Sequence, residues 1–267
     1  MKATKIRFDR FLYLFFVSLV YIFLLTPLVI VVIAAFNSGK YLAFPPEGFS
    51  LKWFKNFFQS QPFMDALKVS LKLGVLTMIC VTLLGTTAAL YVVRHAQKWK
   101  NFLRLIMISP LLLPAILTGI ALLVFYYIIG IGTRTFLGLL MGHVLITLPY
   151  AFLNVYSSLY NFNRSLEEAA RSLGASQLKT FFRITLPLIK PGVISGAMFA
   201  FIVSFDQFPI SLLLKGVGRT TLPIQLFDYV RWDFDPTAAA VSTVSIAITL
   251  GVVLLTEKLV GLDSLRW

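Results

Sequence analysis

Long apolar runs alternate with short polar segments along this chain of 267 residues. At a rise of about 1.5 Å per helical residue, each run is long enough to cross a hydrocarbon core about 30 Å thick. A helix satisfies its own backbone hydrogen bonds in lipid, so we expect an all-α, polytopic membrane protein with six transmembrane helices in a single domain, residues 1–267. The predicted spans are residues 11–36, 69–93, 105–129, 136–160, 192–214 and 237–261.

A polar segment, residues 161–190, interrupts the apolar runs between the fourth and fifth spans. Ser165 and Glu168 have the spacing of a capping box and predict the start of a short helix. Gly174 suits the left-handed residue that ends such a helix, and Ser176 is placed to cap a second one. The apolar stripes are Leu166, Ala169, Ala170 and Leu173 on the first helix and Leu178, Phe181 and Phe182 on the second. This pattern favours docking into a groove of a soluble partner.

Composition and charge agree with a membrane protein and indicate its orientation. Charged residues make up 13% of the chain and the mean hydropathy is +0.85, whereas a soluble domain has about 25% charged residues. The net charge of +13 is scattered over loops, which argues against a nucleic-acid partner. With the N-terminus inside, fifteen Lys and Arg residues fall in inner segments and nine in outer ones. The positive-inside rule then predicts that both termini and residues 161–190 are cytoplasmic, with an uncleaved first span.

Several absences exclude catalysis by this chain. The sequence contains no G-x-x-x-x-G-K-[ST] loop, so we do not expect it to bind or hydrolyse ATP. The single Cys80 excludes an intrachain disulfide and a cysteine-based metal site. His95 and His143, the two histidines, have no metal-ligand neighbours at a suitable spacing. We therefore expect no metal and no cofactor in this chain, and a helix–helix hydrogen bond for His143, with a role in transport as the alternative.

An acidic residue inside a predicted span is the candidate for a solute pathway. Asp206 lies in the fifth span, where an ionised carboxylate costs on the order of 3 kcal/mol unless it is paired or hydrated. Gln207 adds polar capacity next to the helix-breaking Pro209, a common setting for a binding cavity. Phe205, Asp206 and Gln207 are therefore predicted to line a substrate pathway. A buried aspartate bonded to Ser204 or to freed backbone groups remains equally open.

Prolines and closely spaced glycines predict the shape and packing of the spans. Pro110 and Pro114 in the third span and Pro149 in the fourth remove backbone donors and favour kinks. Two glycine pairs have the spacing that permits close helix approach, and we interpret them as packing contacts. These pairs are Gly138/Gly142 and Gly192/Gly196.

The polar segment resembles a known family motif. Glu168-Ala169-Ala170, three residues, Gly174, nine residues and Ile184-x-Leu186-Pro187 are similar to the EAA loop of membrane subunits of binding-protein-dependent ABC importers. The resemblance implies the fold of a type I importer permease in a bacterial inner membrane. It also implies partners: a second permease subunit, an extracytoplasmic solute-binding protein and two ATPase subunits that bind ATP and Mg. The ATPase-coupling residues it implies are Glu168, Ala169, Ala170, Leu173, Gly174, Leu178, Phe181, Ile184, Leu186 and Pro187. Neither motif nor capping pattern gives Glu167 a fixed role.

A second resemblance concerns the solute. Ser204-Phe205-Asp206, Thr221-Leu222-Pro223-Ile224 and Phe36-Asn37-Ser38 resemble the second permease of spermidine/putrescine importers, the PotC-like branch. It implies a polyamine as substrate. That branch has two aspartates where this chain has Asp206-Gln207, so permeases for aminophosphonates or opines are the alternative. Two alternative hypotheses come from other functional classes. One is a proton-coupled secondary transporter with Asp206 as the proton carrier, and the other is a structural scaffold of a membrane complex.

Overall fold

The computed structural model describes residues 2–96, 98–130, 135–216 and 218–261. Within these residues the regular structure is helical, and the β-structure is limited to an isolated antiparallel bridge between Asn37 and Phe49. The all-α prediction is confirmed. The chain divides into two compact units, one formed by the residues up to Gln61 together with Leu226–Ala247, the other by Pro62–Gln225 and the residues from Ile248.

The first unit joins the N-terminal region to the last long helix. It contains α1 (Lys2–Ala35), α2 (Lys52–Gln59), the end of α11 (Leu222–Val230) and the first half of α12 (Thr237–Val260). The Trp53 indole is buried and donates a hydrogen bond to the Asn37 carbonyl at 2.7 Å. The small buried core around it consists of Ala34, Ala35, Trp53, Ala239 and Ala240.

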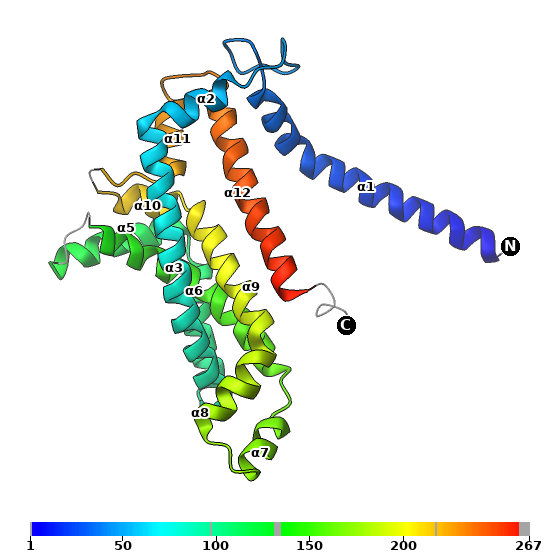
Figure 1. Ribbon diagram of the computed structural model, residues 1–267, viewed down its shortest axis with the longest axis vertical. Helices are drawn as coiled ribbons and strands as arrows, with labels where there is room; N and C mark the ends of the chain where they lie inside the picture. Colours follow the sequence, from blue (N-terminus) through cyan, green and yellow to red (C-terminus); the bar gives the residue numbers. More distant parts are fainter. Residues whose placement is uncertain (1, 97, 131–134, 217, 262–267) are drawn as a thin grey trace. The chain divides into compact units, whose positions relative to one another are not determined.

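The second unit contains the helical bundle and the polar segment. Its long helices α3 (Gln61–Arg94), α6 (Phe136–Tyr160) and α9 (Leu186–Phe205) lie side by side (Figure 1). One core cluster joins these three helices, and a second joins α3 and α6 to two of the shorter helices. The shorter elements are α4 (Lys100–Leu112), α5 (Ala115–Ile128), α7 (Ser165–Ser172), α8 (Gln177–Thr180), the π-helical turn η1 (Phe181–Thr185) and α10 (Pro209–Leu214).

Five of the described helices are long and apolar enough to cross a membrane. The predicted third span is instead two helices, α4 and α5, which are bent by 102° at Leu113 and Pro114. Leu113 has an extended backbone, with φ −96° and ψ 139°, because the ring of a following proline disfavours the helical region. The pair makes a sixth span if it is counted as one. Pro149 lies inside α6, which continues through it without a break.

The fifth span begins and ends earlier than predicted. Helix runs without interruption through α8, η1 and α9, from Gln177 to Phe205, and we call these 29 residues the α8–α9 helix. Asp206 follows as its C-terminal cap, and Pro209 begins the separate helix α10. The prediction of a helix over residues 192–214 is therefore wrong, because Pro209 lacks the amide that would continue the hydrogen-bond ladder.

The glycines of α9 bring this helix into direct contact with α6. A Cβ on Gly192 would lie 2.1 Å from Ser158 Oγ and 2.6 Å from the Asn154 carbonyl oxygen. A Cβ on Gly196 would lie 2.9 Å from the Ala151 Cα. All three distances are shorter than a carbon atom tolerates, so the glycines are required for the approach of the two helices. The interpretation of this pair as a packing contact is confirmed.

His143 joins α6 to α9 and α10. It is fully buried, and its Nδ1 and Nε2 atoms form hydrogen bonds with the hydroxyls of Ser204 and Ser211 at 2.8 and 2.9 Å. The adjacent Gly142 lies against Ile210 of α10. Buried polar side chains of this kind are hydrogen-bonded because an unmade bond is costly. The predicted helix–helix hydrogen bond is confirmed.

Candidate functional site

The turn between α7 and α8 is built on Gly174. This residue has φ +85°, in the left-handed region where a side chain is strained. Its N–H donates to the Arg171 carbonyl at 2.9 Å, and the Ala175 N–H donates to the Ala170 carbonyl at 3.0 Å. These two bonds form a Schellman motif, which satisfies the last carbonyls of α7. The predicted glycine cap is confirmed, as is the Ser176 cap, whose hydroxyl accepts from the Lys179 N–H at 3.3 Å.

The start of α7 differs from the predicted capping box. Ser165 is already the first helical residue, and Asn163 Oδ1 accepts hydrogen bonds from its N–H at 3.1 Å and from its hydroxyl at 2.8 Å. Asn163 therefore takes the role predicted for Ser165, because its amide oxygen reaches both donors. Glu168 is exposed and lies 3.6 Å from Arg164 in an ion pair along the helix. The capping-box prediction is wrong, and the Glu168 side chain is left on the outer face of α7.

Glu167 fixes α7 to the helical bundle, a role the sequence did not indicate. Its side chain is 4% exposed and accepts hydrogen bonds from Arg94 Nη2 and from the Thr185 hydroxyl. Arg94 also donates to the Thr185 hydroxyl at 3.4 Å. Arg94 ends α3 and Thr185 lies in η1, so a single carboxylate joins three elements. The charge pair compensates the burial of the carboxylate, which would otherwise be costly.

The apolar stripe of α7 and α8 points away from the bundle. Leu173 is 89% exposed and Leu178 is 72% exposed, and both flank the Gly174 turn. Phe182 is also exposed, whereas Glu167 and Thr180 face inward and are buried. This arrangement is the reverse of a helix that packs its apolar side on its own protein. Of the other predicted coupling residues, Ala169 and Pro187 are exposed, and Ala170, Phe181, Ile184 and Leu186 are partly buried.

Asp206 lies at the break between α9 and α10, outside the helix in which the sequence placed it. Its side chain is exposed, and none of the described residues pairs with its carboxylate. Phe205 before it is buried and stacks on Phe201, and Gln207 after it is partly buried. The C-terminal end of α9 has a partial negative charge that adds to the carboxylate. A cation is the ligand that these two features favour.

The two predicted sites do not come together. Figure 1 shows α7 and α8 at the lower end of the α3, α6 and α9 bundle, away from α5 and α10. The α8–α9 helix joins the sites, with Ser176 capping its beginning and Asp206 its end. A helix of 29 residues is about 43 Å long. The predicted coupling residues and the predicted solute-pathway residues therefore lie at opposite ends of one continuous helix.

A polar cavity opens between α6 and α9, next to the start of α7. Its volume is about 470 Å³, and its lining includes amide and hydroxyl side chains rather than carboxylates. The polar groups are Asn154, Ser157, Ser158, Asn161, Asn163 and Ser195. Such groups hydrogen-bond a polar solute without the strong attraction of a full charge.

Comparison with known proteins gives similarity over most of the chain. The family described as "Binding-protein-dependent transport system inner membrane component" matches residues 81–257. The chain is 35% identical to the putrescine transport system permease protein PotI of Escherichia coli, over 83% of this chain and 80% of that protein. It is 30% identical to the spermidine/putrescine transport system permease protein PotC of Haemophilus influenzae, over 91% of this chain and 93% of that protein.

A solved structure has the same fold. A chain of a bacterial ABC transporter involved in the import of the acidic polysaccharide alginate superposes with a TM-score of 0.73, at 17% sequence identity. The superposition covers 96% of both chains. At this identity the likeness concerns the fold alone.

Proposed function

Since the chain belongs to the inner membrane components of binding-protein-dependent transport systems, we propose that it is a permease subunit of an ATP-driven polyamine importer. Family membership makes it a multi-pass transport subunit of the inner membrane. The proposal of a polyamine substrate rests on the similarity, along most of the chain, to permeases named for putrescine and spermidine. The exposed, unpaired Asp206 suits a cationic solute of this kind.

The proposed assembly contains three further kinds of subunit. A second, different permease pairs with this chain, two ATPase subunits bind ATP and Mg, and an extracytoplasmic protein delivers the solute. Both termini and the segment 161–190 face the cytoplasm. Because the chain belongs to this family, we do not propose a proton-coupled secondary transporter or a structural scaffold as its function.

The coupling mechanism follows from the two faces of α7. The exposed Leu173 and Leu178 enter an apolar groove of the ATPase, with Glu168 as an outer contact. Glu167 on the opposite face ties α7 to Arg94 and Thr185. Movement of the ATPase is thereby passed to α3 and to the α8–α9 helix. Asp206 receives the cationic solute at the far end, and the amide and hydroxyl groups of the polar cavity guide its release.

Uptake by the assembled importer tests this function. Proteoliposomes with all subunits and the binding protein should accumulate labelled putrescine or spermidine when ATP is supplied to the ATPase side. Accumulation that follows a proton gradient in the absence of ATP would contradict the proposal. Uptake of 2-aminoethylphosphonate or an opine without uptake of polyamines would retain the importer and replace its substrate. The comparison of polyamine uptake with uptake of these other solutes is needed because this chain has Gln207 where the polyamine branch has a second aspartate.

Asp206→Asn is expected to reduce uptake of a polyamine by about tenfold while leaving assembly intact. A cation within ~4 Å of a carboxylate gains about 4 kcal/mol at an effective dielectric of about 20, and a third of that is roughly a tenfold change. The measurement is uptake normalised to assembled complex. Asp65→Asn, at another exposed carboxylate, is the matched control and should retain normal uptake. Unchanged normalised uptake in Asp206→Asn would remove this residue from the solute path.

Gly174→Val is expected to abolish most ATP-driven uptake while the chain still reaches the membrane. A β-branched residue at φ +85° is strained by about 1–2 kcal/mol, so the turn would open and Leu173 and Leu178 would lose their relative placement. Open space surrounds the position, so no clash contributes. Gly174→Asn is the control, because asparagine tolerates this conformation. Equal losses in both variants would mean that the backbone conformation is not what coupling requires.

A further inference from the structure

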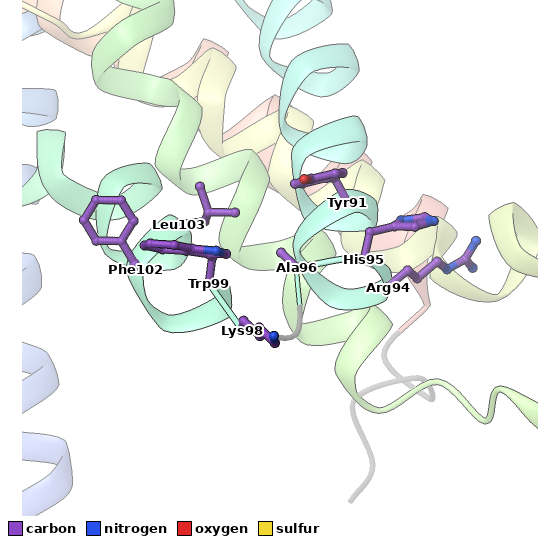
Figure 2. Close-up of a pocket in the computed structure, with 8 residues that line it drawn as sticks. All are labelled: Tyr91, Arg94, His95, Ala96, Lys98, Trp99, Phe102 and Leu103. Atoms are coloured by element: carbon purple, nitrogen blue, oxygen red, sulfur yellow. The ribbon is translucent and has the colours of Figure 1, made fainter.

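A cavity of about 720 Å³ opens where α3 ends and α4 begins. In Figure 2 the rings of Tyr91 and Trp99 lie on two sides of this opening, with Lys98 at its lower edge. Arg94 lies on the α3 side, and Phe102 extends beyond Trp99 along α4. The lining thus combines cations with aromatic side chains.

Among the residues that the structure describes, the lining of this cavity contains basic side chains and no carboxylate. Between Asp65 and Glu167 the sequence contains no acidic residue, and Glu167 is already paired with Arg94. Lys100 and Arg104, on the first turns of α4, lie over the ring of Tyr156 at 5.7 and 5.4 Å from its centroid. Lys98 therefore adds its charge to a strongly basic segment. An anion is the ligand that this field attracts.

The residues around the cavity have the pattern expected at a membrane surface. The apolar run of α3 ends directly before Arg94, and Trp99 beyond it is 65% exposed. Exposed tryptophan at the end of an apolar run is typical of the membrane–water interface. Phe102, Leu105 and Ile106 continue from the cavity as exposed apolar side chains on α4. A molecule with an anionic head and an apolar tail would match both the basic cavity and the exposed apolar side chains of α4.

We propose that this cavity binds the headgroup of an anionic phospholipid. The phosphate accepts hydrogen bonds from the Lys98 ammonium and from the indole N–H of Trp99. An acyl chain lies along Phe102, Leu105 and Ile106. Basic pockets between membrane helices recognise anionic headgroups by this combination of charge and apolar contact. Because Arg94 is also bonded to Glu167, the bound lipid lies one side chain away from the coupling segment.

The test is the lipid retained by the full chain, purified in its complex from membranes and exchanged into nanodiscs of equal phosphatidylglycerol and phosphatidylcholine. Native mass spectrometry should show phosphatidylglycerol enriched at least about fivefold among bound lipids. Lys98→Ala combined with Trp99→Ala should remove that enrichment. The control combines Lys258→Ala with Trp232→Ala, which changes an exposed lysine and an exposed tryptophan elsewhere, and should retain it.

Two further measurements separate a lipid from a free anion and from a folding defect. Inorganic phosphate at millimolar concentration should leave the bound phosphatidylglycerol in place. Its displacement by phosphate alone would overturn the lipid assignment in favour of a small-anion site. Thermal unfolding of the Lys98/Trp99 variant should remain within a few degrees of the parent. Equal retention of both lipids by the parent protein would also overturn the proposal.

Discussion

Glu167→Ala is expected to destabilise the folded chain by about 3 kcal/mol and to abolish ATP-driven uptake. The substitution removes a carboxylate that is 4% exposed and leaves Arg94, itself 21% exposed, without its partner. An uncompensated buried charge costs about 3–5 kcal/mol, and the partial exposure of Arg94 places the loss at the lower end. Without the carboxylate, α7 also loses its bonds to α3 and η1. Thermal unfolding in detergent and uptake by the reconstituted importer measure the two effects.

Glu168→Ala is the matched control for this prediction. The two residues are neighbours in the same helix, but the Glu168 side chain is 66% exposed and its pair with Arg164 is on the surface. The expected loss of stability is below about 0.5 kcal/mol. Replacing Arg94 and Glu167 together by methionine should recover most of the stability, because an apolar pair avoids the unpaired charge. Equal stability of the two alanine variants would show that the buried pair does not hold α7.

Gly192→Val is expected to disrupt the contact between α6 and α9 and to lower stability by about 3 kcal/mol. Even the Cβ atom would lie 2.6 Å from the backbone oxygen of Asn154 and 2.1 Å from Ser158 Oγ. The helices must separate to admit it, and overpacking of this kind costs about 1–3 kcal/mol. The loss should appear as a lower unfolding temperature and as less protein in the membrane.

Two variants show whether the backbone contact is responsible. Gly251→Val adds the same side chain to a helical glycine of α12 with nothing within 4 Å of the new Cβ, and should change stability by less than about 1 kcal/mol. Gly192→Val combined with Ser158→Ala removes the hydroxyl but retains the Asn154 oxygen, so it should stay destabilised. Full recovery in that double variant would mean that only the side chain of Ser158 resists the substitution.

Local signals predicted the parts of this molecule that local interactions decide. Residues 136–160 were predicted as a span and form α6 with the same bounds, because Thr135 caps it and the apolar run ends with it. Gly174 was identified because its backbone conformation is itself a local property. The start of α7 was misplaced by one or two residues, since Asn163 and Ser165 are both good caps and only the geometry selects Asn163.

Long-range contacts account for what the sequence did not predict. Glu167 and Glu168 are identical residues in one helix, and what distinguishes them is Arg94, which is 73 positions away in the chain. The start of the fifth span was predicted too late in the sequence. The charged residues Lys179 and Arg183 lower the local hydropathy, which is typical of a loop rather than of a membrane span. Both side chains are exposed in the structure, and the helical backbone continues through both residues without interruption. Asp206 was correspondingly placed inside a helix that ends before it.

The uninterrupted α8–α9 helix has a mechanical consequence. If this helix, about 43 Å long, tilts as a rigid body by about 10° around its midpoint, each end moves by about 4 Å. Its midpoint is pressed against α6 by Gly192 and Gly196, so that contact serves as a fulcrum and the helix as a lever. With the pivot at that contact, a small displacement near Leu178 is expected to move Asp206 in the opposite direction.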